Sequence, residues 1–185
     1  KRKAKTEGKV HLGFKIELRK LWSDISALIE KKKKHQLWIC GHSLGGAMAT
    51  LCASRLEELE PTLYTYGSPR VGGSEWRDGC DVEHYRFVNN NDIVTAVPLW
   101  LMGYRHHGAV RYIDYYGRIK RLTFGQKVKD QILGRWKALT KFQLFDGIYD
   151  HDIAGGYADK LQALWFEGRE KIRKRANVGH DRKNV

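Results

Sequence analysis

Apolar positions along the chain follow two alternating patterns. Short apolar runs at residues 36–40, 63–66 and 83–88 predict strands, the first of them buried. Apolar residues at helical spacing over residues 14–29, and a stretch rich in Ala, Leu and Met over residues 44–58, predict helices. Further elements are expected as a short helix at 75–80, strands at 109–116 and 119–124, a basic amphipathic helix at 124–141, and a helix striped with apolar residues over 153–165. Strands that alternate with helices predict an α/β fold with a mostly parallel central sheet flanked by helices.

The length of 185 residues, 42% of them apolar, predicts one domain that spans residues 1–185. Within it, residues 167–185 are charged and lack a strong apolar period, so we expect a helical extension that frays into a tail. The sequence contains no run of about 18 apolar residues, so it predicts no membrane-spanning helix. The basic N-terminus has no apolar stretch after it, so the chain shows no secretory signal. These features leave the compartment open.

The formal net charge is +13, and the excess of Lys and Arg gathers at residues 1–5, 31–34 and 169–175. Such clusters can attract an anionic lipid surface or a nucleic acid. Aromatic residues do not interleave with the basic clusters as a stacking platform for bases requires, so we expect no nucleic-acid partner. A solubilising charged surface is the favoured interpretation, and peripheral contact with a lipid surface is the alternative.

Three cysteines, Cys40, Cys52 and Cys80, form an odd set without C-x-x-C spacing. The set predicts neither a disulfide framework nor a zinc site. Cys40 falls on a predicted strand and Cys52 on a predicted helix, where both are expected to pack as small apolar side chains.

A predicted strand and a predicted helix flank the sequence Gly41-His42-Ser43-Leu44-Gly45, which is a G-x-S-x-G motif. A strand, a sharp turn and a helix form the context in which this motif exposes a serine nucleophile on a strained turn. Gly41 and Gly45 are expected to leave room where a Cβ atom would clash. The N–H of Leu44 lies at a helix N-terminus and is a candidate donor to an oxyanion. The pentapeptide alone would fit a glycine-rich turn with a surface serine equally well.

A serine hydroxyl needs a neighbouring base before it becomes a good nucleophile. In hydrolases built around this motif, an acid and then a histidine follow the serine along the chain. Asp92 follows the third predicted strand, at the same end of the sheet as Ser43, and is the candidate acid. Of the eight histidines, His151 lies well downstream in a loop before the last helix, and it is the candidate base. Asp150 and Asp152 are too near His151 in sequence to orient its ring, so we expect them to cap that helix.

The alternative base is the pair His106 and His107, which could also be read as metal ligands. Adjacent residues of a strand point to opposite faces, so such a pair rarely binds one ion, and we expect no metal site.

Residues 93–102 are unusually apolar for a loop. Val94, Val97, Pro98 and Leu99 could line an acyl pocket, or the segment could cover the core, and the pattern supports both interpretations equally. His42, beside the candidate nucleophile, is a further candidate for contact with substrate.

With these residues in hand, the chain resembles the class 3 lipases, α/β hydrolases of the fungal triacylglycerol lipase type. The resemblance rests on five blocks in the family's order: VHLGF at 10–14, GHSLGG at 41–46, YGSPRVG at 66–72, VNNNDIV at 88–94 and DH at 150–151. It implies that Ser43, Asp92 and His151 are the catalytic serine, aspartate and histidine. It also implies hydrolysis of carboxylic esters, often acylglycerols at a lipid–water interface, without a metal or organic cofactor.

In that family, a segment upstream of the first block carries further strands and the second oxyanion donor. The resemblance therefore implies that the 185 residues are the C-terminal part of a longer protein. The N-terminal part is then expected to be cleaved off, disordered or present as a separate fragment. A catalytically silent, lipase-like interaction module is the alternative function, and the presence of both Ser43 and His151 argues against it.

Overall fold

The computed structural model describes residues 8–32, 35–90, 92–114, 117–120 and 150–181 of the chain. At its centre is a sheet with the strand order β1-β2-β3-β4-β5. The strands are β1 (Trp38–His42), β2 (Thr62–Tyr66), β3 (Glu83–Asn89), β4 (Ala109–Ile113) and β5 (Ile119–Lys120). The first four run parallel, and β5 pairs antiparallel with β4. The predicted α/β fold with a mostly parallel sheet is confirmed.

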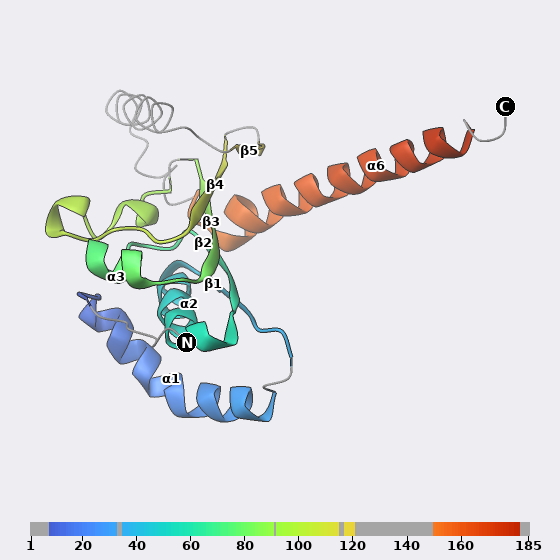
Figure 1. The fold of residues 1–185 in the computed structure, drawn as a ribbon. Coiled ribbons are helices and arrows are strands. Elements are labelled where there is room, and N and C mark those ends of the chain that lie inside the picture. The colour runs from blue at the N-terminus through green and yellow to red at the C-terminus, as the bar shows by residue number, and fades with distance from the viewer. Residues whose placement is uncertain (1–7, 33–34, 91, 115–116, 121–149, 182–185) are drawn as a thin grey trace, which may run out of the picture.

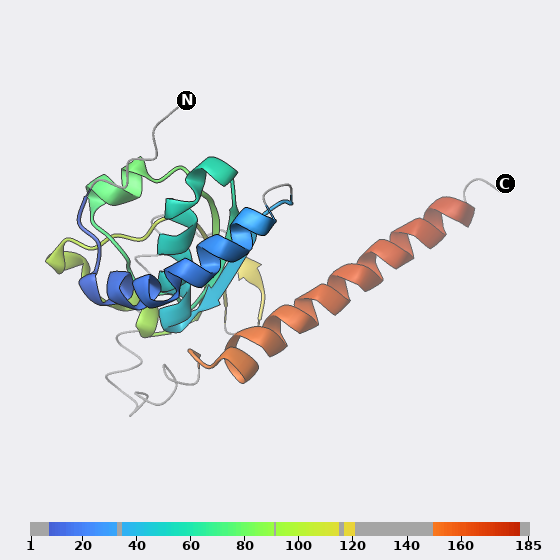
Figure 2. The ribbon, with the colours of Figure 1, turned by 90° about the horizontal axis from the view of Figure 1, so that it is seen from below.

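Helices α1 (Leu12–Lys31), α2 (Ser43–Arg55) and α3 (Ser74–Gly79) lie on one face of the described sheet (Figure 1). The helical elements before β4 are α1 (Leu12–Lys31), α2 (Ser43–Arg55), η1 (Glu57–Leu59), α3 (Ser74–Gly79), η2 (Val94–Ala96) and η3 (Trp100–Met102). Of these, α2 connects β1 to β2, and α3 connects β2 to β3. A π-helical turn, η4 (Ile153–Ala158), leads into α6 (Asp159–Asp181). Figures 1 and 2 show α6 extending away from the sheet, on the side opposite to α1 and α2.

The core lies between the sheet and the helices α1, α2 and α3. One buried cluster joins Leu18 of α1, Leu51 and Cys52 of α2, and Trp76 of α3. A second cluster packs alanines of α2 against Leu63 of β2, which is completely buried. Because small residues dominate the buried face of α2, its backbone lies close to the strands that hold the Ser43 turn.

Strand β1 departs from the prediction in two ways. It runs from Trp38 to His42 instead of over residues 36–40, so the strand reaches the residue before Ser43. It is also not a buried strand, because it lies at the edge of the described sheet, where the side chain of Trp38 is 70% exposed. The expected packing of cysteines as apolar side chains is therefore wrong for the exposed Cys40, and it is confirmed for Cys52.

The later elements agree with the prediction where the structure describes them. The last helix begins with the π-helical turn η4 and continues to Asp181, through most of the predicted charged extension. The strand expected at 119–124 is β5 over its first two residues. Its remainder, and the basic helix expected at 124–141, lie outside the described residues. No helix in the described part of the chain combines the length and the apolar character that a bilayer span needs.

A buried histidine on β3, His84, lies on the face of the sheet that the helices cover. His84 pairs with Leu63 across β2 and β3, so both lie on the helix-covered face. Its Nε2 atom is 2.7 Å from Thr65 Oγ1, and its Nδ1 atom is 3.2 Å from His107 Nδ1. Burial, followed by the nearby charges of His107 and Arg86, lowers the pKa of His84 to about 3. The imidazole is therefore neutral in the folded protein near neutral pH.

We predict that His84 makes the folded protein sensitive to mild acid. Between the ordinary histidine pKa of 6.5 and about 3, the unfolded chain binds a proton at this residue that the folded chain does not. The contribution of His84 to stability is therefore fully present above the unfolded pKa and declines as the pH falls, by about 2 kcal/mol between pH 7 and pH 5. Urea unfolding at both pH values measures this loss. The loss should be smaller in His84→Gln, and an equal loss in both proteins would contradict the prediction.

Candidate active site

Ser43 lies where β1 ends and α2 begins, on a turn that strains its backbone. Its φ is +55°, in the left-handed region that residues with a Cβ atom rarely adopt. A Cβ atom at Gly41 would overlap the carbonyl oxygen of Gly45, so the turn requires glycine at position 41. A Cβ atom at Gly45 would meet no atom within 4 Å, so the expectation that Gly45 avoids a clash is wrong. The turn that the motif predicts is thus present, with one obligatory glycine instead of two.

Three side chains that are far apart in the sequence form one hydrogen-bonded row. The Nε2 atom of His151 lies 2.8 Å from Ser43 Oγ, and its Nδ1 atom lies 3.0 Å from each carboxylate oxygen of Asp92. A carboxylate only accepts hydrogen bonds, so Nδ1 carries the proton and Nε2 is free to accept from the Ser43 hydroxyl. The Asp92 side chain is fully buried, whereas the His151 side chain remains 18% exposed. The structure therefore brings Ser43, His151 and Asp92 together in the order that activates a serine.

Two further donors among the described residues contact the carboxylate of Asp92. The backbone N–H of Val94 donates to Oδ1 at 2.9 Å, and the hydroxyl of Tyr157 donates to Oδ2 at 2.6 Å. Burial and the adjacent Asp92 charge raise the pKa of Tyr157, so its hydroxyl stays protonated and can donate. In the sequence, Tyr157 falls within the apolar stripe of the helix predicted over residues 153–165, and that pattern does not indicate this contact. The available signal was the residue type, because a buried tyrosine usually finds a partner for its hydroxyl.

His42 ties the serine turn to the segment that carries His151. Its Nε2 atom lies 2.7 Å from the backbone oxygen of His151, and because a carbonyl only accepts, this nitrogen carries the proton. The two imidazole rings lie 4.7 Å apart between centroids. His42 therefore contacts the main chain of His151, and its contact with substrate stays a prediction.

Gly67, the residue after β2, makes room for the row. Its φ is +59°, and a Cβ atom there would lie 2.7 Å from Asp92 Oδ2 and 3.0 Å from His151 Nδ1. Any larger residue would therefore push the acid and the histidine apart. Gly67 belongs to the block at residues 66–72, but the sequence does not indicate this role, because the close approach exists only once the three segments are folded together.

The backbone N–H of Leu44 is oriented by the start of a helix. Leu44 is the second residue of α2, so its N–H is among the first four, which have no acceptor within the helix. These groups sit at the positive end of the helix dipole, next to Ser43. The Leu44 side chain is 47% exposed and leaves this side of the turn open. The role of the N–H as an oxyanion donor stays a prediction.

The apolar segment at 93–102 does not cover the core. None of its residues is buried: Val94 and Pro98 are half-buried, while Val97 is 47% and Leu99 50% exposed. Its main chain is anchored by Arg70, whose guanidinium donates to the carbonyl oxygens of Ala96 and Pro98. Of the two interpretations, the core cover is wrong, and contact of this segment with substrate stays a prediction.

The alternative histidines point to separate partners. His106 Nε2 lies 2.8 Å from the carbonyl oxygen of Thr95, and His107 Nε2 lies 3.0 Å from the carbonyl oxygen of Cys80. Burial, as the largest cause, lowers the pKa of both imidazoles below the ordinary value. Within the described ranges, no group of three or more His, Cys, Asp or Glu residues could hold a metal ion.

The two aspartates beside His151 behave differently. Asp152 is the N-cap of η4 and accepts a hydrogen bond of 2.8 Å from the Gly155 N–H, as predicted. The prediction of a cap is wrong for Asp150, because its carboxylate faces the end of β3. There it accepts from the side-chain amides of Asn89 and Asn90.

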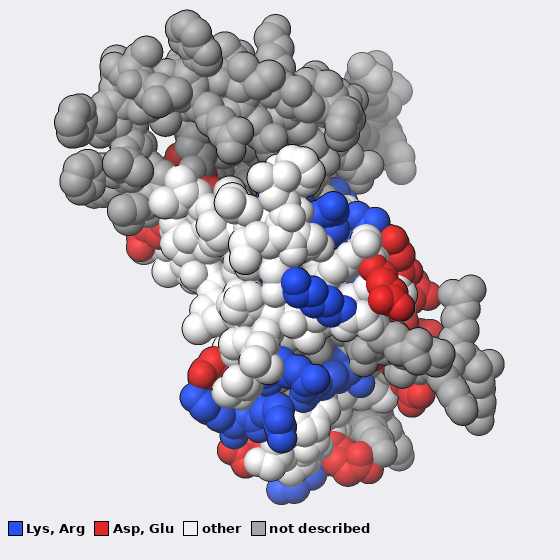
Figure 3. All heavy atoms as spheres, turned by 90° about the vertical axis from the view of Figure 1, so that its left-hand side faces the viewer, with Lys and Arg blue, Asp and Glu red and all other residues white. Residues whose placement is uncertain are grey.

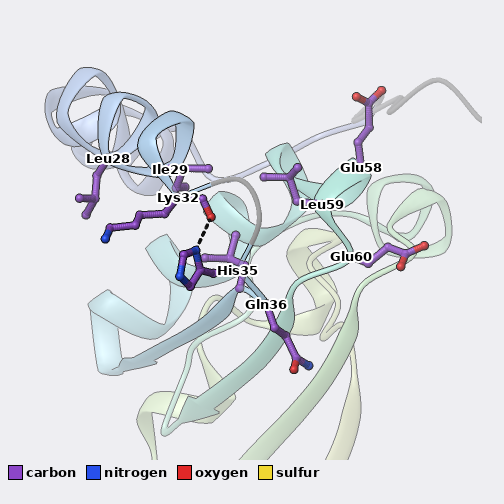
Figure 4. A pocket seen from close by; sticks show the side chains of 9 residues that line it. Leu28, Ile29, Lys32, His35, Gln36, Glu58, Leu59 and Glu60 are labelled. Atoms are coloured by element: carbon purple, nitrogen blue, oxygen red, sulfur yellow. Dashed lines mark hydrogen bonds between the residues drawn. The ribbon is translucent and has the colours of Figure 1, made fainter.

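A separate pocket of about 460 Å³ opens at the other end of β1 (Figure 4). Its apolar lining includes Leu28 of α1, Leu59 of η1 and Leu37, which precedes β1. Lys32 and Glu60 are among its charged lining residues. Because β1 runs from this pocket toward Ser43, the two lie at opposite ends of the strand. The pocket contains none of the predicted site residues.

Comparisons with known proteins agree with the fold and the motif. The family model described as lipase (class 3) matches residues 1–102. The secreted mono- and diacylglycerol lipase 1 of Fusarium solani is 33% identical over 114 residues, which cover 57% of this chain and 34% of the relative. A lipase of Rhizomucor miehei is 33% identical over 119 residues, which cover 57% of this chain and 33% of the relative. The chain thus spans about a third of the length of these relatives.

Solved structures of lipases also resemble this chain in fold. The crystal structure of a lipase from Rhizopus microsporus var. chinensis aligns with a TM-score of 0.54 and 31% identity, covering 57% of this chain and 42% of that one. The Rhizomucor miehei lipase propeptide complex aligns with a TM-score of 0.55 and 30% identity, covering 60% of this chain and 40% of that one.

We predict that Gly67→Ala disrupts the row while the fold survives. The added methyl group would separate Asp92 from His151, so the reaction of Ser43 with a sulfonyl fluoride should slow by about 10²-fold. Intact-mass measurement over time follows this modification. Gly168→Ala is the matched control, because a Cβ atom at Gly168 meets nothing within 4 Å. Equal modification rates in both variants would show that the space at Gly67 is not needed.

Proposed function

The chain belongs to the class 3 lipase family, and from this premise we propose that it is a serine ester hydrolase that cleaves carboxylic esters, acylglycerols among them. The observation that carries the proposal is the hydrogen-bonded row of Ser43, His151 and Asp92. It supplies a nucleophile, a base and a group that orients the base, which are the parts that acyl transfer needs.

In the proposed reaction, Ser43 Oγ attacks the ester carbonyl carbon while His151 Nε2 takes the hydroxyl proton. Asp92 holds the Nδ1–H and stabilises the imidazolium that forms. The carbonyl oxygen becomes an oxyanion beside the Leu44 N–H. The ester C–O bond then breaks, His151 returns the proton to the leaving alcohol, and an acyl-serine remains. Water that is deprotonated by the same imidazole then attacks this acyl group. The bond between the acyl carbon and Ser43 Oγ breaks, the imidazolium returns the proton to Ser43 Oγ, and the carboxylic acid is released.

We also propose that a further segment pairs with β1 and supplies the second oxyanion donor. An edge strand with an exposed apolar side chain can pair with another chain. Trp38 is 70% exposed on β1, which has a partner on one side only in the described sheet. A separate N-terminal fragment of the same protein is the candidate partner. Loss of one oxyanion donor typically lowers the rate about 10²–10³-fold, so activity would depend strongly on this segment.

Contact with a lipid surface is supported by the apolar loop beside Asp92. Trp100 is 58%, Leu101 74% and Met102 59% exposed. Figure 3 shows this side of the molecule, where uncharged surface spreads over the middle and Lys and Arg side chains gather next to it. Lys9 and Arg105 bind main-chain carbonyl oxygens of the loop, so cations lie at its base. The exposed residues 100–102, here called the apolar tip, lie next to these cations. This combination suits a lipid surface with anionic headgroups.

Ser43→Ala should abolish ester hydrolysis. Loss of the serine of a triad lowers kcat by about 10⁴-fold or more, because no other group forms the acyl intermediate. Hydrolysis of a soluble p-nitrophenyl ester by the full-length protein measures this. Ser23→Ala, at an exposed position of α1, is the matched control. Hydrolysis that persists in Ser43→Ala would refute the assigned nucleophile, and inactive wild type would favour a silent lipase-like module.

Substitution of the apolar tip should affect interfacial substrates only. The double variant Trp100→Gln and Leu101→Gln removes apolar area that would enter the lipid, so activity on an acylglycerol emulsion should fall about tenfold. Activity on a soluble short-chain ester should stay unchanged. Trp165→Gln is the matched control, because this tryptophan is 56% exposed on α6, on the opposite side of the molecule (Figure 1). Equal losses on both substrates would contradict contact with lipid.

A further inference from the structure

Asn89 connects the end of β3 with the segment that carries His151. It is the last residue of β3, and it is completely buried. Its Nδ2 atom donates to the carbonyl oxygen of Asp150 at 2.8 Å and to that of Gly156 at 3.0 Å. The same nitrogen lies 3.3 Å from the Asp150 carboxylate. One amide group therefore binds the main chain on both sides of His151.

The backbone of Asn89 reaches the acid as well. Its carbonyl oxygen accepts from the N–H of Asp92 at 2.9 Å. Its own N–H donates to the hydroxyl of Tyr157 at 3.0 Å, and that hydroxyl donates to Asp92 Oδ2. Asn89 thus contacts both the turn that carries Asp92 and the segment that carries His151.

The residue type at position 89 fits this task. Two carbonyl acceptors need two donor hydrogens, and a primary amide supplies both from one nitrogen. Lys160 Nζ donates to Asn89 Oδ1 at 2.8 Å, which fixes the orientation of the amide. An aspartate of the same shape would place an acceptor against two carbonyl oxygens and beside the Asp150 carboxylate.

We propose that Asn89 is a positioning residue of this site, which holds the His151 imidazole at hydrogen-bonding distance from both Asp92 and Ser43. The role in turnover rests on the proposed hydrolysis, whereas the role in geometry does not. A purely structural asparagine would affect stability alone. A positioning residue affects kcat at unchanged KM, because the substrate still binds while the base is misplaced.

The test compares Asn89→Asp with Leu63→Val in the full-length protein. Leu63→Val weakens the core cluster between α2 and the sheet and leaves the row untouched. With a soluble ester, Asn89→Asp should lower kcat about 10²-fold at a KM within about twofold of wild type. Leu63→Val should keep kcat within about twofold at a lowered Tm. Equal kcat losses in both variants, or wild-type kcat in Asn89→Asp, would overturn the proposal.

A readout without substrate separates this proposal from the proposed function. In protein with ¹⁵N-labelled histidine, the Nδ1 proton of His151 held by Asp92 should give a low-field NMR signal. The signal should be present in wild type and Leu63→Val and broadened by water exchange in Asn89→Asp. If wild type hydrolyses no ester, the proposed function fails, and this signal alone decides the role of Asn89. A signal that is unchanged in Asn89→Asp would overturn it.

A second variant covers the case in which Asn89→Asp does not fold. Lys160→Met removes the donor to Asn89 Oδ1 and the 3.4 Å ion pair with Asp150 from a side chain that is 23% exposed, so the fold should survive. It frees the amide on one side, and kcat should fall about threefold to tenfold with a weaker Nδ1 signal. Wild-type kcat and an unchanged signal in Lys160→Met would count against the positioning role.

Discussion

The hydrogen bonds from Asp92 through His151 to Ser43 are the interaction on which the proposed chemistry depends. Because Ser43 follows β1 and Asp92 follows β3, both residues lie at the carboxyl ends of the parallel strands, on the same side of the sheet. Among the described residues, no strand leads directly into His151. Side-chain hydrogen bonds hold its main chain instead. His42, on the serine turn, donates to the carbonyl oxygen of His151, and Asn89, at the end of β3, donates to that of Asp150.

Burial links the stability of this region to its geometry. A buried carboxylate is costly unless donors surround it. Within the described part of the chain, Asp92 has three: the backbone N–H of Val94, the Nδ1–H of His151 and the hydroxyl of Tyr157. Val94 belongs to the turn of Asp92 itself, whereas His151 and Tyr157 belong to a segment about 60 residues further along the chain, so these hydrogen bonds also fix where that segment lies. Gly67 completes the arrangement by leaving the space that the contact requires.

The turn that holds Ser43 could be predicted most directly from the sequence, because a strand, a glycine-rich turn and a helix are all local features. His151 was reached by elimination, since its partners are remote in the sequence. The parts that sequence reasoning missed are tertiary: the Tyr157 hydroxyl and the Asn89 amide acquire their roles only through contacts across about 60–70 residues. The expectation that β1 is buried failed for a related reason. Apolar composition reports the tendency to be covered, and in the described sheet nothing pairs with the outer side of this strand.

The most direct measurement of the central claim is detection of the acyl group itself. When the full-length protein is mixed with a p-nitrophenyl ester and quenched with acid, peptide mass spectrometry should find the acyl group on Ser43. A burst of p-nitrophenol close to one equivalent should accompany it, and neither should appear in His151→Ala. Turnover with no acyl group on Ser43, or acylation at an undiminished rate in His151→Ala, would contradict the account.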